Sequence, residues 1–199
     1  MPNGSTASVI DAAPAQSPVQ VSGLSLIPGQ TLNFSVTGAV SNTPFLPPPT
    51  ATPDGEVFIS HLPGSQNGIS DITAPINSLV GVFLDNSQPD STSAPAALNF
   101  SSIGLNFSSL APQVKQVFFI GDGLTGTGSG AVQNFIVPTG ATRLFLGPLD
   151  YGTYNNGGSF TVKVEAVPEP STIFGLGLLG LGAFCQRKLS QEKKSKQDN

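Results

Sequence analysis

The chain has few of the residues on which most enzymes and metal centres depend. Its single cysteine, Cys185, allows no disulfide within one chain and excludes a thiolate metal site. Its single histidine, His61, provides no basis for a Ser-His-Asp triad, and the motif G-x-S-x-G is absent. The sequence therefore excludes the commonest hydrolase signatures.

Positive charge is the second shortage. Only 10% of the 199 residues are charged, and the part before Val167 holds nine acidic residues against three basic ones, Lys115, Arg143 and Lys163. An acidic domain has no counter-charge for a phosphate backbone. We therefore expect no nucleic-acid partner.

Two patterns leave an enzymatic interpretation formally open. Gly121 to Gly126 matches G-x-G-x-x-G, but a dinucleotide site also needs a helix to begin there, and more Gly, Thr and Ser follow instead. We expect a hairpin loop at this position. A paired-carboxylate glycosidase also remains possible, although no spacing favours a pair among the candidates Asp54, Glu56, Asp85, Asp90 and Asp150. We predict a noncatalytic protein.

Turn residues and short apolar runs are what the chain has in abundance. It holds 23 glycines and 18 prolines, yet 38% of its residues are hydrophobic, and many of these alternate with polar residues. This pattern is typical of short strands joined by turns. We predict an all-β fold, an antiparallel β-sandwich or jelly roll. The predicted strands cover residues 32–37, 57–60, 78–85, 114–120, 131–137, 142–147 and 160–166, with a brief helix possible within 99–110.

We divide the chain into a disordered segment 1–18, a β-sandwich domain 19–166 and a tail 167–199. Residues 1–18 lack the charged and apolar regions of a signal peptide. We expect that the chain is truncated or misassigned at its start, or that Met1 follows a removed signal peptide. If the chain is complete, its export is in question.

The tail has three parts in a fixed order. Pro168, Glu169 and Pro170 come first, an uncharged stretch from Ser171 to Cys185 follows, and the basic pair Arg187 and Lys188 ends it. A stretch of 15 residues would form a helix of about 22 Å, shorter than a usual membrane span. A buried core helix is the alternative. Basic residues behind an apolar run are typical of the cytoplasmic side of a membrane segment.

This order of parts resembles the PEP-CTERM sorting signal of exported bacterial proteins, from Val167 to about Lys188. The resemblance implies recognition near Pro168–Pro170 by an exosortase-type enzyme and removal of the tail. It also implies a C-terminal hydrophobic helix outside the domain, which anchors the chain transiently in the inner membrane. The final location would be the cell surface or the medium.

The segment 146–164 contains the best candidate for a ligand site. Asp150, Asn155 and Asn156 offer oxygen ligands of the kind that calcium prefers, and Tyr151 and Tyr154 offer aromatic faces for a sugar ring. An ordinary Asn/Gly turn before a strand is the alternative that the residues alone favour.

The same segment, with Pro53-Asp54-Gly55 and Gly81, resembles the small calcium-dependent galactose-binding lectins of bacteria. The resemblance implies a jelly roll in which calcium bridges protein and sugar hydroxyls, and extracellular polysaccharide as a partner. Thr52 and Gly55 replace the sugar-contacting His and Gln of that family, so we do not expect galactose specificity. The implied metal ligands are the side chains of Asp150, Asn155 and Asn156 and the carbonyls of Asn42 and Thr153. We predict carbohydrate contacts at Asp150, Tyr151, Tyr154 and Asp54. The competing hypothesis is a purely structural envelope or matrix protein without a ligand site.

Overall fold

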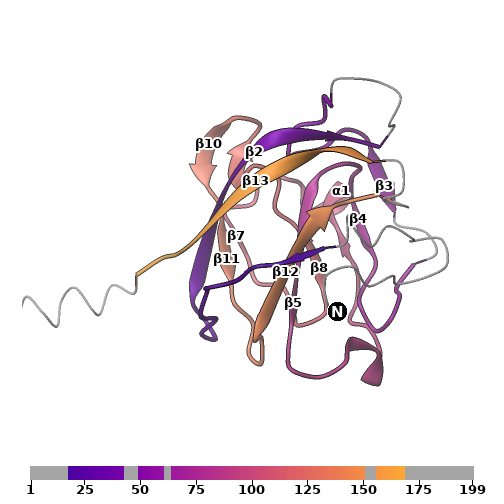
Figure 1. Ribbon diagram of the computed structural model, residues 1–199, viewed down its shortest axis with the longest axis vertical. Helices are drawn as coiled ribbons and strands as arrows, with labels where there is room; N and C mark the ends of the chain where they lie inside the picture. The colour runs from indigo at the N-terminus through magenta and orange to yellow at the C-terminus, as the bar shows by residue number, and fades with distance from the viewer. Residues whose placement is uncertain (1–17, 43–48, 61–63, 151–155, 169–199) are drawn as a thin grey trace, which may run out of the picture. The chain divides into compact units, whose positions relative to one another are not determined.

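The computed structural model describes residues 18–42, 49–60, 64–150 and 156–168 (Figure 1). The predicted disordered segment, apart from Pro18, and the predicted tail helix lie outside these residues. The chain divides into two units, Met1–Ala166 and Val167–Asn199. Within the described residues, no helix is both long and apolar enough to cross a membrane.

The regular secondary structure of the described residues is almost entirely strand, which confirms the all-β prediction. Two four-stranded sheets have the orders β1-β12-β5-β8 and β13-β2-β11-β7, and smaller sheets have the orders β3-β4-β6 and β10-β9. The strands of the two large sheets are β1 (Val19–Gln20), β12 (Arg143–Pro148), β5 (Leu79–Leu84), β8 (Val117–Phe119), β13 (Gly157–Ala166), β2 (Thr31–Ser41), β11 (Asn134–Ile136) and β7 (Ser109–Leu110). The smaller sheets contain β3 (Phe58–Ser60), β4 (Ile72–Pro75), β6 (Leu98–Asn99), β10 (Ser129–Val132) and β9 (Leu124–Gly126).

The two four-stranded sheets share one hydrophobic core. Leu32, Phe34 and Val36 of β2 are buried, whereas the residues between them are more exposed, as the period-2 pattern predicts. The same core cluster takes in Phe83 from β5 and Phe118 from β8, whose rings stack with their centroids 5.2 Å apart. Residues from strands of both sheets are therefore buried together.

A second cluster lies under the smaller three-stranded sheet. It joins Ile72 and Ala74 of β4 to Phe100, Phe119 and Leu149. Phe100 begins the short helix α1 (Phe100–Ile103), whose first turn is capped by the Asn99 side chain. The helix ends after one turn at Gly104, which has a φ of 81°. The helix predicted within 99–110 is thus limited to four residues.

Some details differ from the expected pattern. The strand expected over 131–137 is divided, because β10 ends at Val132 and pairs with β9, whereas β11 begins at Asn134 and pairs with β2. The short pairs β11–β7 and β4–β6 are parallel, because β7 and β6 belong to long connections rather than to tight hairpins. The strand expected over 114–120 begins only at Val117, because Lys115 has a φ of 68° and interrupts the extended backbone.

The Gly121–Gly126 motif runs from a turn into β9, which pairs with β10, so no helix begins there.

Candidate functional site

The predicted ligand site lies only partly within the described residues. Asp150, Asn42, Asn156 and Asp54 are described, as is Pro168 of the sorting motif. The remaining predicted site residues lie outside the described ranges: Tyr151, Thr153, Tyr154, Asn155, Glu169, Pro170, Arg187 and Lys188.

Strand pairing brings Asn42 and Asn156 to the same end of one sheet. β13 runs antiparallel to β2, and its first residue, Gly157, pairs with Ser41, the last residue of β2. Asn156 and Asn42 are the next residue outward on each strand. Of the predicted ligands that are described, these two are therefore neighbours by register.

The close approach of β13 and β2 depends on glycine. Gly158 has a φ of 80°, and a Cβ built there would lie 2.2 Å from the carbonyl oxygen of Ala39. Gly38 has a φ of 103°, and its Cβ would lie 2.3 Å from the carbonyl oxygen of Ser159. A side chain at either position would force the strands apart just where Asn156 is positioned.

Asp150 follows β12, the strand next to β5 in the other large sheet. The preceding residue, Leu149, is 4% exposed and is fixed by two backbone bonds. Its N–H donates to the carbonyl of Ser78 at 2.8 Å, and its carbonyl accepts from the N–H of Asn77 at 2.7 Å. These two hydrogen bonds join Leu149 to the residues just before β5, and they fix the backbone next to Asp150.

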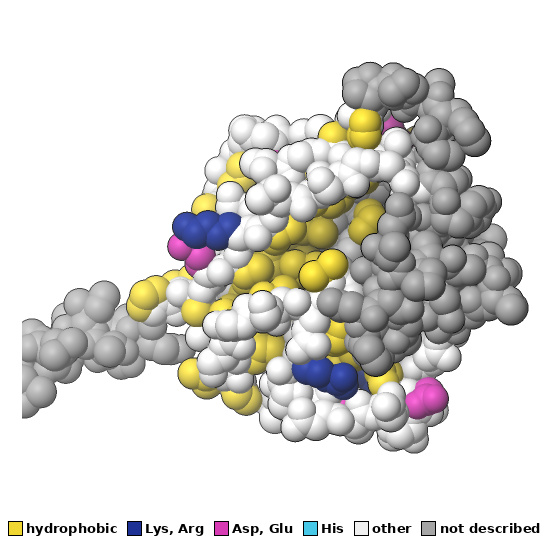
Figure 2. All heavy atoms as spheres, viewed as in Figure 1, with side chains coloured by type: hydrophobic (Ala, Val, Ile, Leu, Met, Phe, Trp, Pro, Cys, Tyr) yellow, Lys and Arg dark blue, Asp and Glu magenta, His cyan; other side chains and the backbone are white. Residues whose placement is uncertain are grey.

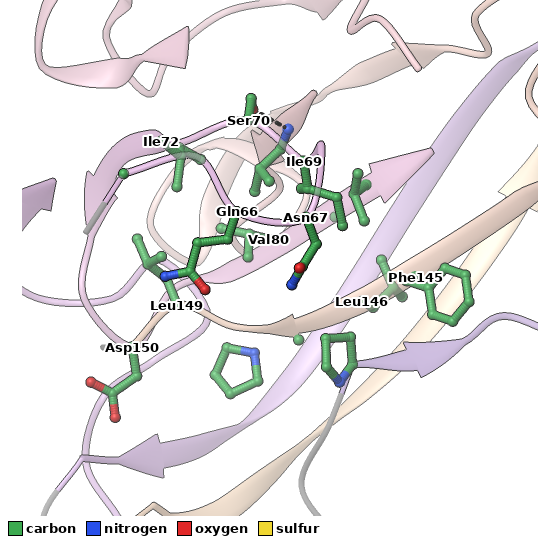
Figure 3. A pocket seen from close by; sticks show the side chains of 17 residues that line it. Gln66, Asn67, Ile69, Ser70, Ile72, Val80, Phe145, Leu146, Leu149 and Asp150 are labelled. Carbon is green, nitrogen blue, oxygen red and sulfur yellow. Dashed lines mark hydrogen bonds between the residues drawn. The ribbon is translucent and has the colours of Figure 1, made fainter. Parts of the chain in front are cut away.

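A pocket of about 180 Å³ lies beside Asp150 (Figure 3). Ile72, Val80 and Leu149 give it apolar walls, and Gln66 and Asn67 add amide groups at its rim. Figure 3 shows the carboxylate of Asp150 at the edge, directed away from the pocket. Asn156 instead lines a different hollow, between β1 and β13.

Asp54 has a structural partner of its own. Its Oδ1 accepts a hydrogen bond from the N–H of Asp122 at 3.0 Å. The Asp122 carboxylate in turn accepts from the N–H groups of Leu124 and Gly128, at 2.8 and 2.6 Å. Asp54 thus holds the turn between β8 and β9. Across the described ranges, no three His, Cys, Asp or Glu residues gather into a group able to hold a metal ion.

The three basic residues of the domain have structural roles that the sequence did not predict. Two of them donate hydrogen bonds to loop carbonyls, and the third forms an ion pair. The Nζ of Lys115 donates to the carbonyls of Pro89, Thr92 and Ser93 and to the Thr92 hydroxyl. Arg143 donates to the carbonyl of Asp85 and, at 3.0 Å, to that of Ser87. Lys163 pairs with Glu165 at 2.8 Å. The only feature of the sequence that pointed to these roles was the scarcity of basic residues before Val167.

The sequence also did not predict the residues at the rim of the pocket beside Asp150. Gln66 pairs with Ile69 around a tight turn through Asn67 and Gly68, which have φ values of 50° and 72°. The Asn-Gly dipeptide is a hairpin-turn signal that could have located this turn. It could not have shown that the turn lies beside Asp150, some 80 residues later in the chain.

The described tail is short. β13 pairs with β2 as far as Ala166, which is opposite Leu32, and Val167 and Pro168 follow without regular structure. Val167 is 38% exposed. The ladder therefore ends immediately before the predicted sorting motif.

Comparison with known families supports the interpretation of the tail. Residues 166–188 match the PEP-CTERM protein-sorting motif. Comparisons with curated proteins and with solved structures find no significant match. The motif implies sorting by an exosortase-type system to the cell surface. The resemblance to galactose-binding lectins receives no support from these comparisons.

Proposed function

We propose that this chain is a noncatalytic β-sandwich domain that an exosortase-type enzyme releases from its membrane anchor and leaves at the cell surface. The match of residues 166–188 to the sorting motif carries the proposal. The match begins at Ala166, the last residue of β13. Cleavage near Pro170 would therefore leave every described strand in place.

The experiment compares processing in cells with and without an exosortase. The full chain, tagged within the domain, should be recovered from the cell surface with a C-terminus near Pro170 when the enzyme is present. Replacing Pro168, Glu169 and Pro170 together by alanine should abolish this product. Glu192→Gln lies beyond the matched residues and serves as the control, which should be processed normally.

Mass spectrometry of the surface-released protein decides the result. A released chain that retains Lys188 would contradict the proposal. So would equal processing of the triple alanine variant and the control, because cleavage would then not depend on the motif.

A second proposal concerns the ligand of the displayed domain. Asn42 and Asn156 are neighbours through the β2–β13 pairing, and Asp150 projects from a backbone fixed by two hydrogen bonds. Amide, carbonyl and carboxylate oxygens are what calcium prefers. Only six positions along the chain separate Asp150 from Asn156. We propose that Asp150, Asn156 and Asn42 together bind calcium and, through it, a carbohydrate of the envelope or matrix.

Calorimetry with calcium on the full chain tests the metal. Asp150→Asn should remove the binding heat and the accompanying rise in melting temperature. Asp90→Asn, an exposed residue of the 3₁₀ turn Pro89–Ser91, makes the same change of charge and should leave both unchanged. If the unaltered chain gives neither heat nor a shift, the domain is a structural surface protein without this site. Calcium-dependent retention on a glycan array would then separate a lectin from a calcium-stabilised scaffold.

A further inference from the structure

β13 is a long strand with one open edge. It contains ten residues, and β2 is its only strand partner among those that the structure describes. Every second backbone N–H and C=O of such an edge points away from the sheet and lacks a ladder partner. Long open edges invite pairing with another strand unless charge, proline or a bulge prevents it.

The apolar face along this edge is also incompletely covered. Phe160, Val162 and Val164 pack against the main core but remain only partly buried. They form one wall of a groove of about 780 Å³, and Val21 and Leu146 belong to the opposite wall. Figure 2 shows hydrophobic side chains gathered in a hollow on this face of the molecule.

The edge strand β1 forms the other rim of this groove. It has only two residues, and its first residue, Val19, is 60% exposed. The two large sheets thus end here with a long strand facing a very short one. An added strand beside β13 would satisfy the open backbone groups and cover the half-buried side chains together. A small apolar ligand would cover the side chains but would leave the backbone groups without partners.

We propose that the occupant is a second copy of this chain, paired antiparallel through β13 to form one continuous sheet across the dimer. Its register follows from the charges of β13. Lys163 and Glu165 lie on the outer face, with side chains 68% and 61% exposed. A symmetric pair centred on Val164 places Lys163 of each copy opposite Glu165 of the other.

Neighbouring symmetric registers lack this complementarity. A pair centred on Lys163 places two lysines opposite each other, and one centred on Glu165 does the same with two glutamates. A pair centred on Val162 leaves both charges opposite uncharged residues. Opposite charges across a strand pair stabilise it and like charges destabilise it, so the register centred on Val164 is selected.

The same register fits the ends of the strand. Within β13 it pairs residues 162–166 of one copy with residues 166–162 of the other, a ladder of five residues on each strand, and Pro168 lies beyond its end. Pro168 cannot donate to a ladder, so it limits further pairing at this end. The inner faces then bring Val164 against its symmetry mate and Val162 against Ala166, which covers the open side of each groove with apolar side chains.

Charge reversal on the full chain tests both the dimer and its register. The chain is studied in mild detergent because of its apolar tail, by analytical ultracentrifugation over a range of concentrations. Lys163→Glu replaces two attractive pairs by two repulsive ones, and Glu165→Lys does the same with the opposite sign. Each should weaken dimerisation on the order of tenfold or more. Both side chains are largely exposed, so folding should be unaffected, which circular dichroism checks.

Mixing provides the decisive measurement. The Lys163→Glu chain carries two negative charges on β13 and the Glu165→Lys chain two positive ones, so an equimolar mixture should form heterodimers of at least unaltered strength. The chain with both reversals should dimerise like the original. Asp90→Asn changes a charge outside β13 and should have no effect.

Two results would overturn the proposal. One is an unaltered chain that stays monomeric up to about 1 mM, the range of very weak complexes. The other is a dimer equally strong in both single reversals, because it would be held by the apolar tail or by another surface.

Discussion

The sharpest test of the described core is one added methyl group at Gly81. This residue lies in the middle of β5, between β12 and β8, and pairs with Leu146 on one side and Phe118 on the other. Its backbone is in the ordinary extended range, so alanine would cause no backbone strain. Any cost of Gly81→Ala therefore comes from packing.

The expected magnitude follows from the contacts of the added Cβ. It would lie 2.9 Å from Cδ1 of Ile120, 2.9 Å from Cζ of Phe118 and 3.2 Å from Cδ2 of Leu146. Ile120 and Phe118 are both 0% exposed, so neither can move into solvent. Overpacking of this kind costs about 1–3 kcal/mol, and the reduced freedom of the unfolded chain returns about 0.4–1 kcal/mol. We expect a net loss of about 1–2 kcal/mol, or a melting temperature lower by about 2–8 °C.

Calorimetry is the suitable assay, because the chain has no tryptophan to report unfolding. Gly147→Ala is the matched control on the neighbouring strand, where the added Cβ would meet nothing closer than Pro18 at 3.7 Å. It should be neutral or slightly stabilising. Ile120→Val removes the nearest methyl group, so the double variant should be at least about 0.5 kcal/mol more stable than the two single losses predict. Equal stability of Gly81→Ala and Gly147→Ala would refute the packing of this core.

Three further predictions concern polar groups. Gln133 is 0% exposed and donates to the carbonyls of Leu105 and Phe107, so Gln133→Leu should lower the free energy of unfolding by about 2 kcal/mol in denaturant titration. Lys115→Met should cost about 1 kcal/mol and speed proteolysis of the loop at 89–93, which loses its four hydrogen bonds to Nζ. The hydroxyl of Ser87, and then its N–H, lower the pKa of Asp85, so this carboxylate contributes stability above pH 3.8 that is lost as pH falls through its depressed pKa. Ser87→Ala should raise that pKa toward its ordinary value, as an NMR titration would show.

Local pattern was enough to predict most strands but not their partners. The alternation from Phe160 to Ala166 predicts a half-buried strand, and β13 covers it. Its extension back to Gly157 depends on glycine backbones that hydrophobic periodicity does not detect. Its pairing with β2 joins residues more than 100 positions apart, which no local signal encodes.

The candidate site shows the same limit. The tail motif could be recognised from sequence because its three parts are contiguous, whereas a ligand site depends on which loops meet. The Asn-Gly turn at Asn67 gave no indication that it lies beside Asp150. Polar residues with a purely structural role could not be predicted either. Nothing near Gln133 in the sequence indicates that its side chain donates to the carbonyls of Leu105 and Phe107 in a distant loop.

The placement of charge limits what the displayed domain can bind. Before Val167 the chain carries six more acidic than basic residues, and all three basic side chains are already held by carbonyls or by Glu165. An anionic polysaccharide would thus meet a repulsive surface with no uncommitted cation from this part of the chain. We therefore expect that a glycan ligand is neutral, or that an anionic glycan is held only through calcium. Retention of an acidic glycan in the presence of a chelator would contradict this, and its loss in the Asp150→Asn chain but not in the Asp90→Asn chain would place the bridging ion beside Asp150.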